Sequence, residues 1–277
     1  MQIAFWGNSR GKAGITSNIA AISTFMALEM QIKIVLFENH FNLNNLENGF
    51  LENSYDDFVM ESPFYYHHLG IDQVMKRLDS HIRIQEVIKD AALEPITEKL
   101  FYIPQSNTGN KEVFEYELNQ ILEVLLKELG KFAQIVFVDT AVSDNLTTKT
   151  ILDTADFIVM NLCQDPFLLM DCFRRFHSIR KKCIYLLGNY DRYSRYTIKY
   201  VMRKFEIPKE RIAVIPYNTG FKDALSLGRL VAFLSRNMLC SKQDENYYFI
   251  KELKRACKIV YNLVCQNKEG SIDTAVS

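Results

Sequence analysis

The sequence has no excess of charge of either sign, because 33 Lys and Arg residues balance 33 Asp and Glu residues. Overall charge therefore does not indicate nucleic acid or an acidic surface as a partner, and any such case must rest on a local cluster. The sequence also lacks an apolar run of roughly 18 residues that could span a bilayer and a secretory leader. We expect a cytoplasmic protein with no integral membrane segment.

Paired cysteines and flexible linkers are also missing. The six cysteines show no C-x-x-C spacing, and several lie in apolar segments, where a reduced cysteine behaves as a small hydrophobe. Disulfide and metal roles are therefore not expected for them. Because no stretch rich in Pro, Gly or Ser divides the chain, we expect a single domain over residues 1–277, with 266–277 a flexible tail.

What the sequence does contain is an alternation of apolar runs and segments with helical spacing. The strand-like runs are 3–6, 33–37, 100–103, 133–139, 156–161, 183–187 and 211–215. The helix-like segments include 16–30, 71–77, 83–92, 112–129, 166–181 and a last one from about 247 to 265. This alternation predicts βαβ units and an α/β fold with one doubly wound, mostly parallel sheet covered by helices on both faces.

The first strand is followed by a Gly-rich loop, residues 7–14, and then by Thr16 and Ser17 at the start of a helix. Glycines let backbone amides approach a phosphate, and a helix N-terminus adds free donors and a favourable dipole. A P-loop also carries a lysine directly before its Ser/Thr pair, where this chain has Ile15. The loop therefore predicts a phosphate site without its lysine, the alternative being a plain strand-to-helix turn.

Several motifs together resemble the ParA/MinD family of deviant P-loop ATPases over nearly the whole chain. Residues 10–17 stand where the family has K-G-G-x-G-K-T-T, Asp139-Thr140 matches its D-T-P, and 215–218 resembles its closing segment near the adenine. The resemblance implies a SIMIBI-type P-loop NTPase fold that binds ATP and Mg²⁺. Within the family, the loop and the Asn-rich turn after the second strand look most like TadZ-type pilus-assembly relatives with an atypical Walker A loop.

The resemblance also implies a set of site residues. Thr16 would bind Mg²⁺ directly and Asp139 through water, while Ser17 would contact the α-phosphate and the amides of 12–16 the β-phosphate. The nucleotide-binding candidates are Arg10, Gly11, Lys12, Ala13, Gly14, Ile15, Thr16, Ser17, Asn189, Pro216 and Asn218. For Asn189 and Asn218, contact with the adenine edge competes with ordinary turn chemistry.

Two basic residues of the loop have alternative roles. Arg10 stands where the family's signature lysine reaches across an ATP-sandwiched dimer, and its guanidinium suits phosphate recognition; the alternative is a solvated loop charge. Lys12 is a candidate to fold back and replace the missing lysine.

The catalytic candidates are Glu38 and Asp139. Glu38 ends the second strand, where the family orients the attacking water; the alternative is a solvated turn or a helix cap. His40 follows two residues later, and an isolated histidine is more often structural than catalytic. Because Ile15 removes a charge that would stabilise the phosphates during transfer, we expect hydrolysis to be slow or lost, as in a degenerate ATPase.

The resemblance therefore implies an ATP-dependent dimerising switch or scaffold. It would position a partner assembly, such as a Tad/Flp pilus or secretion machine, by docking a partner ATPase or a polar landmark, with possible recruitment to the membrane or cell pole. The alternatives are an active ATPase with a substituted loop and a DNA-binding partition protein. DNA would bind two basic helices carrying Arg174, Arg175, Arg180, Lys181 and Lys182, and Arg192, Arg195, Lys199, Arg203 and Lys204.

The last helix is basic and amphipathic, and its apolar positions allow two interpretations. A helix of this kind can lie on an anionic membrane, as the C-terminal helix of MinD relatives does. Packing of the apolar face against the sheet is the interpretation that we favour.

Overall fold

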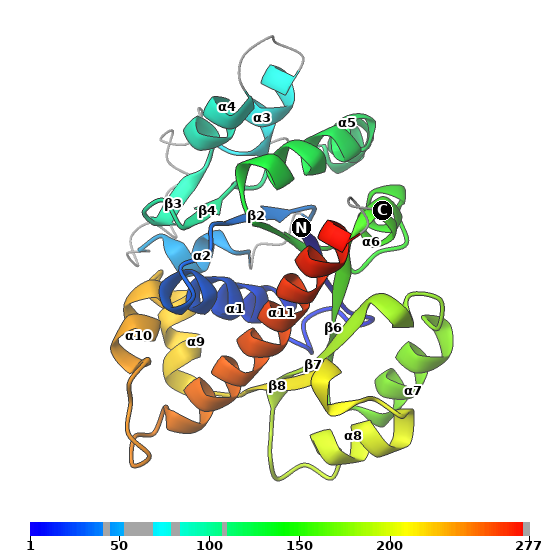
Figure 1. Cartoon of the computed structure of the whole chain (residues 1–277), viewed down its shortest axis with the longest axis vertical. Coiled ribbons are helices and arrows are strands. Elements are labelled where there is room, and N and C mark those ends of the chain that lie inside the picture. Colours follow the sequence, from blue (N-terminus) through cyan, green and yellow to red (C-terminus); the bar gives the residue numbers. More distant parts are fainter. Residues whose placement is uncertain (41–44, 53–68, 79–83, 107–109, 274–277) are drawn as a thin grey trace.

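The apolar runs of the sequence pair into one eight-stranded sheet in the computed structural model, which describes residues 1–40, 45–52, 69–78, 84–106 and 110–273 (Figure 1). Its spatial order is β3-β4-β2-β5-β1-β6-β7-β8. The strands are β1 (Gln2–Trp6), β2 (Ile34–Glu38), β3 (Leu93–Ile96), β4 (Leu100–Tyr102), β5 (Ile135–Asp139), β6 (Phe157–Leu162), β7 (Cys183–Tyr190) and β8 (Ile212–Pro216).

All pairings are parallel except that of β3 with β4, at one edge. Parallel strands that are buried on both faces read as continuous apolar runs, and β1, β2 and β5 do so. In register, Glu38 of β2 lies opposite Asp139 of β5, and Phe5 of β1 lies on the other side of Asp139. The loops after these three strands therefore emerge at one edge, where open α/β sheets bind ligands.

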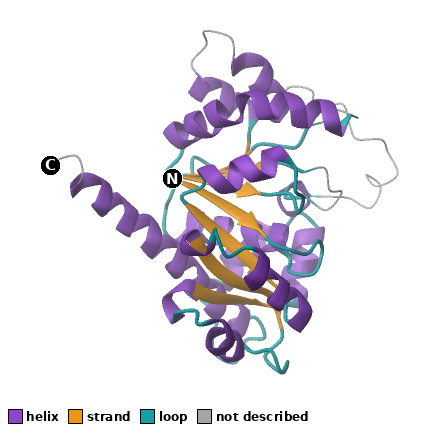
Figure 2. Cartoon of the chain, turned by 90° about the vertical axis from the view of Figure 1, so that its right-hand side faces the viewer, coloured by secondary structure: helices purple, strands orange, loops and turns teal. Residues whose placement is uncertain are grey.

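Helices cover both faces of the sheet, each over its own hydrophobic core (Figure 2). One core lies beneath α3 to α8 and the other beneath α1 and α9 to α11. The helices are α1 (Ile15–Glu29), α2 (Glu47–Phe50), α3 (Ile71–Leu78), α4 (Ile84–Ala91), α5 (Lys111–Phe132), α6 (Leu146–Thr154), α7 (Pro166–Arg175), α8 (Ile198–Phe205), α9 (Thr219–Ser226), α10 (Leu230–Asn237) and α11 (Tyr247–Asp273).

This architecture confirms the predicted fold class, but two predicted basic helices are wrong in extent. The segment 166–181 is helical only to Arg175, and Arg180 to Lys182 form a separate 3-10 turn. Arg192 and Arg195 precede α8, which begins at Ile198. The basic residues therefore do not form two continuous helical rows.

The apolar face of α11 is buried, which confirms that this helix packs on the sheet. Phe249, Leu253 and Val260 are at most 2% exposed and belong to the core beneath α1 and β8. The helix continues to Asp273, through most of the segment for which the sequence predicts a tail. Among the described helices, none is long and apolar enough to cross a bilayer.

Candidate functional site

The Gly-rich loop between β1 and α1 adopts a conformation that depends on glycine. Gly11 and Gly14 have φ values of +75° and +63°, in the left-handed region that favours glycine, and Gly14 is the N-cap of α1. The loop also passes close to the end of β7. A Cβ atom on Gly188 would lie 1.9 Å from the carbonyl oxygen of Ala13, so that position requires glycine as well.

Buried asparagines hold this loop in place. Nδ2 of Asn18, in α1, donates to the carbonyl oxygen of Ala13 (2.9 Å) and to Oδ1 of Asn161 in β6 (2.8 Å). Nδ2 of Asn161 in turn donates to the carbonyl oxygen of Trp6 (3.2 Å). Both asparagines are at most 2% exposed, so these bonds are buried. They tie the loop and the start of α1 to β6, and β6 to the end of β1.

The loop forms one wall of a cleft of about 590 Å³ at the carboxyl edge of the sheet. The cleft brings together most of the nucleotide-site residues that the sequence predicts, namely Arg10, Gly11, Gly14, Ile15, Thr16, Ser17, Asp139 and Asn189. The hydroxyl of Thr16 and the carboxylate of Asp139 supply oxygen atoms, the donor type that Mg²⁺ prefers, so the residues present fit this ion. The volume is typical of a small-molecule site.

Four of the predicted nucleotide-binding residues are not among the described residues that line this cleft. Ala13 is buried behind the loop. Pro216 ends β8, and Asn218 is the N-cap of α9, where its Oδ1 accepts from the amide of Phe221 (2.7 Å). The fourth is Lys12, whose Nζ lies 3.5 Å from Oδ2 of Asp165, so that its charge faces the start of α7.

Asn189 does not follow the strand, as the sequence predicts, but lies within β7, where the pairing with β8 is irregular, and its side chain contacts the loop. Its φ of +48° is in the left-handed region, which asparagine tolerates better than most residues. Its Nδ2 donates to the carbonyl oxygen of Lys12 (3.2 Å), and its side chain lies against Gly14. The strained backbone thus directs the amide onto the loop at the cleft wall.

Positive charge in the cleft comes partly from residues that the sequence did not single out. Besides Arg10, the lining includes Lys111 at the start of α5 and Lys222 of α9. Nζ of Lys111 lies 3.4 Å from Oε1 of Glu115, and Nζ of Lys222 lies 5.5 Å from the ring centroid of Tyr217. Lys222 also lines an adjoining cleft with Thr16 and Ser17. No local pattern marks these lysines, because only the fold brings them to the loop.

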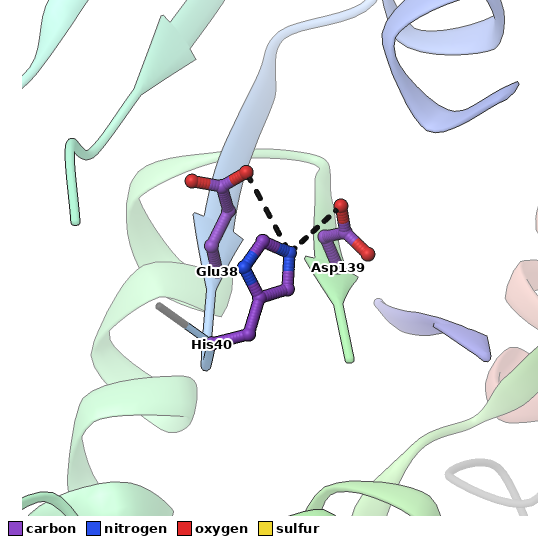
Figure 3. A group of neighbouring side chains, drawn as sticks. All are labelled: Glu38, His40 and Asp139. Carbon is purple, nitrogen blue, oxygen red and sulfur yellow. Dashed lines mark ion pairs between the residues drawn. The ribbon is translucent and has the colours of Figure 1, made fainter. Parts of the chain in front are cut away.

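At the end of β2 and β5, Glu38, His40 and Asp139 converge (Figure 3). Nε2 of His40 lies 3.2 Å from Oδ2 of Asp139 and 3.9 Å from Oε1 of Glu38. The alternative interpretation of Glu38 as a solvated turn residue is wrong, because its side chain is buried and hydrogen-bonded. Its Oε1 accepts from the amide of Leu46 (2.7 Å), and its Oε2 accepts from the hydroxyl of Tyr102 (2.9 Å). Residues 41–44 of the expected Asn-rich turn lie outside the described part.

Burial and mutual charge shift the ionisation of this cluster. Burial raises the pKa of Glu38 to about 7; His40 opposes this change and Asp139 adds to it. Burial alone would lower the pKa of His40, but the hydrogen-bonding and charge effects of Asp139, with the charge of Glu38, outweigh it, and the pKa of His40 is raised. Near neutral pH, Glu38 and His40 therefore hold protons more tightly than isolated side chains do.

Comparisons with known proteins identify the fold. A scan against protein-family models and a search of curated proteins find no match. Among solved structures, a ParA family ATPase from Chlorobium tepidum has a TM-score of 0.69 at 14% identity, covering 92% of this chain and 98% of its own. The chain has the MinD/ParA fold.

Two MinD structures show the same fold. The cell division ATPase MinD of Pyrococcus furiosus has a TM-score of 0.67 at 14% identity, covering 95% of this chain and 99% of its own. The septum site-determining protein MinD of Pyrococcus horikoshii, complexed with Mg-ADP, has a TM-score of 0.64 at 14% identity, with coverages of 94% and 95%. The MinD/ParA fold thus accounts for nearly the whole chain.

Proposed function

We propose that this protein is an ATP-dependent dimerising switch or scaffold of the ParA/MinD type, with weak or no hydrolysis. The observation that carries the proposal is the cleft in which the Gly-rich loop, Thr16 and Asp139 meet without a lysine at position 15. A cleft of this form retains the backbone donors that hold phosphates but lacks one charge that acts on them during transfer.

Mg²⁺ and ATP are the ligands that these residues suit. Thr16 and Asp139 would hold the ion, which supplies charge neutralisation at the phosphates when bound. Arg10, Lys111 and Lys222 add positive charge to the same cleft. MinD of Pyrococcus horikoshii, which shares the fold, was solved with Mg-ADP. Three peripheral cations thus complement a polyphosphate even though the loop lysine is replaced.

Equilibrium binding tests this ligand directly. Titration of the protein with ATP in the presence of Mg²⁺ should give one site, and Thr16→Ala should weaken it at least about tenfold through loss of an ion ligand. Thr154→Ala, on the exposed end of α6, is the matched control and should bind as the unmodified protein does. If ATP fails to bind at millimolar concentration, the proposed nucleotide switch is wrong.

The partner belongs to the same proposal. A TadZ-like version of the protein would position a Tad/Flp pilus or secretion machine by docking a partner ATPase or a polar landmark, and through that partner reach the membrane or cell pole. An ATP-dependent dimer would support a switch, and a dimer indifferent to ATP would support a scaffold. Co-purification with a pilus or secretion ATPase, compared with and without ATP, separates the two.

A true ATPase with a substituted loop is the second candidate, because Arg10 lies on the cleft wall. Single-turnover hydrolysis should then fall at least about tenfold in Arg10→Ala, since a charge-assisted hydrogen bond is worth roughly 1.5–3 kcal/mol. Lys12→Ala, whose charge faces Asp165, should change it little. Absence of hydrolysis with candidate partners present would rule out this version.

A DNA-partition function rests on the exposed Lys199, Arg203 and Lys204 of α8. Binding through these charges would be non-specific and would fall steeply with salt. If the protein retains no DNA, or retains DNA to the same extent at low and high salt, this candidate function is ruled out.

A further inference from the structure

The Glu38, His40 and Asp139 side chains at the ends of β2 and β5 form a cluster whose donor chemistry differs from that of a magnesium site. One imidazole nitrogen and two carboxylate oxygens face one another, all within 4.8 Å (Figure 3). Imidazole suits zinc, iron, copper and nickel, whereas Mg²⁺ prefers oxygen. A mixed set of nitrogen and oxygen donors is the type found in catalytic zinc and non-haem iron sites.

The distances between the donors leave room for one ion. Ligands at roughly 2.0–2.2 Å from a metal stand roughly 3–4 Å from each other in tetrahedral or five-coordinate sites. Nε2 of His40 lies 3.2 Å from the Asp139 oxygen and 3.9 Å from the Glu38 oxygen. These two distances therefore match those between ligands of one ion, and the two carboxylate oxygens lie within 4.8 Å of each other.

Charge in the cluster favours a cation. Glu38 and Asp139 are each 1% exposed, and His40 is 6% exposed. Two buried carboxylates and one imidazole carry a net negative charge when both acids are ionised, even with His40 protonated. Buried charge of this kind is stable when it is paired or bound to a metal. A divalent ion bound to the neutral imidazole would balance both carboxylates.

Neighbouring side chains orient the donors. The hydroxyl of Tyr102 donates to Oε2 of Glu38, which leaves Oε1 toward His40. The side-chain amide of Gln105 lies 3.1 Å from Nδ1 of His40. In the structure the amide nitrogen of Gln105 faces Nδ1; metal binding requires the amide to turn over, so that its oxygen accepts the Nδ1 proton and the lone pair of Nε2 of His40 faces the carboxylates. Hydrogen bonds of this kind, from neighbouring side chains to the ligands, fix the orientation of the ligands in metal sites.

We propose that Glu38, His40 and Asp139 bind a divalent transition-metal ion such as Zn²⁺, Mn²⁺ or Fe²⁺. Asp139 would contact this ion directly and the Mg²⁺ that accompanies a nucleotide at Thr16 only through water. His40 and Asp139 both line the 590 Å³ cleft, so the cluster adjoins the phosphate loop. The site does not require a nucleotide, and its failure would leave the proposed ATP site untouched.

Metal binding is tested on the full-length, untagged protein after chelator treatment, without nucleotide. Titration with Co²⁺ should give one equivalent and the visible absorption bands of a four- or five-coordinate ion. His40→Ala should weaken Co²⁺ binding at least about tenfold, as loss even of an outer partner does. His177→Ala, an exposed histidine, and Thr16→Ala are matched controls and should retain the bands.

A second measurement needs no substitution in the cluster. The pulsed paramagnetic resonance spectrum of Mn²⁺ bound to the unmodified protein should show coupling to one imidazole nitrogen, which changes when histidine is labelled with ¹⁵N. Coupling that persists in His177→Ala supports the site. Bound Mn²⁺ without nitrogen coupling, equal Co²⁺ affinity in folded His40→Ala, or no binding of either metal would overturn the proposal.

Discussion

Ile15 places an apolar side chain directly before Thr16 and Ser17, at the wall of the cleft. Its side chain is half-buried and packs on the core beneath α1. Its Cδ1 atom would lie 3.3 Å from a Cβ on Gly7, so it fills the inside of the loop. The neighbouring Thr16 and Ser17 still reach the cleft. Position 15 therefore contributes apolar packing and no charge to the cleft.

A lysine at position 15 should strengthen nucleotide binding. In Ile15→Lys, the aliphatic stem can follow the path of isoleucine while the ammonium reaches the cleft. A charge-assisted hydrogen bond contributes roughly 1.5–3 kcal/mol, so ATP should bind about tenfold tighter or more. Calorimetric titration measures this change, and Ile15→Met is the matched uncharged control. Equal affinity in the two variants would show that the loop does not hold phosphates.

Glu38 should make stability depend on pH. Its pKa is about 7 when folded and 4.5 in its unperturbed form, so the folded state binds more protons between these values. Its contribution is complete below pH 4.5 and is lost as pH rises through about 7; the raised pKa of His40 acts in the same direction. A shift of this size corresponds to a loss on the order of 3 kcal/mol in the free energy of unfolding.

Urea unfolding of metal-free protein at several pH values between 5 and 8 measures this effect. The neutral isostere Glu38→Gln keeps one acceptor oxygen for the amide of Leu46, while its NH₂ group can donate to the hydroxyl of Tyr102, and it should flatten the decline. Exposed Glu86→Gln should leave it unchanged. A wild-type profile that rises over this range would contradict the assigned direction.

At the scale of elements, the buried parallel strands could be predicted from sequence, whereas β3 and α2 could not. β5 and β6 are long apolar runs because helices cover both of their faces. β3 is half-buried, contains Pro95 and pairs only with β4, so its sequence lacks the apolar signal of a central strand. α2 has four residues, too few to show a helical period.

The asparagine bridge between α1 and β6 is an element contact with a measurable energy. Asn161→Ala removes the acceptor of Asn18 and leaves that amide with one fewer partner in a buried site. The free energy of unfolding should fall by roughly 1–3 kcal/mol. Denaturant unfolding tests this, with Asn262→Ala on the exposed side of α11 as the control. If the free energy of unfolding falls equally in the two variants, the asparagine bridge does not stabilise the fold.

At the scale of the whole molecule, the candidate site is assembled from segments far apart in the chain. Asp139 and the loop could be placed together from sequence, because both follow strands of one parallel sheet. The burial of Glu38 depends on Tyr102 and Leu46, and the position of Lys222 depends on how α9 packs. Those contacts come from tertiary packing, which local patterns do not encode.

Dimerisation is the property of the whole molecule that most sharply tests the proposed switch. Arg10 is exposed on the loop at the cleft. From there its guanidinium could contact a phosphate of the nucleotide bound to a second subunit. Light scattering after size exclusion should show monomers without ATP and dimers with ATP and Mg²⁺. Arg10→Ala should lose the dimer while ATP binding falls by less than about tenfold, because most phosphate donors lie within one subunit. The control variant Arg236→Ala, at an exposed position of α10, should still dimerise. If the Arg10→Ala protein dimerises normally, Arg10 is not part of the interface.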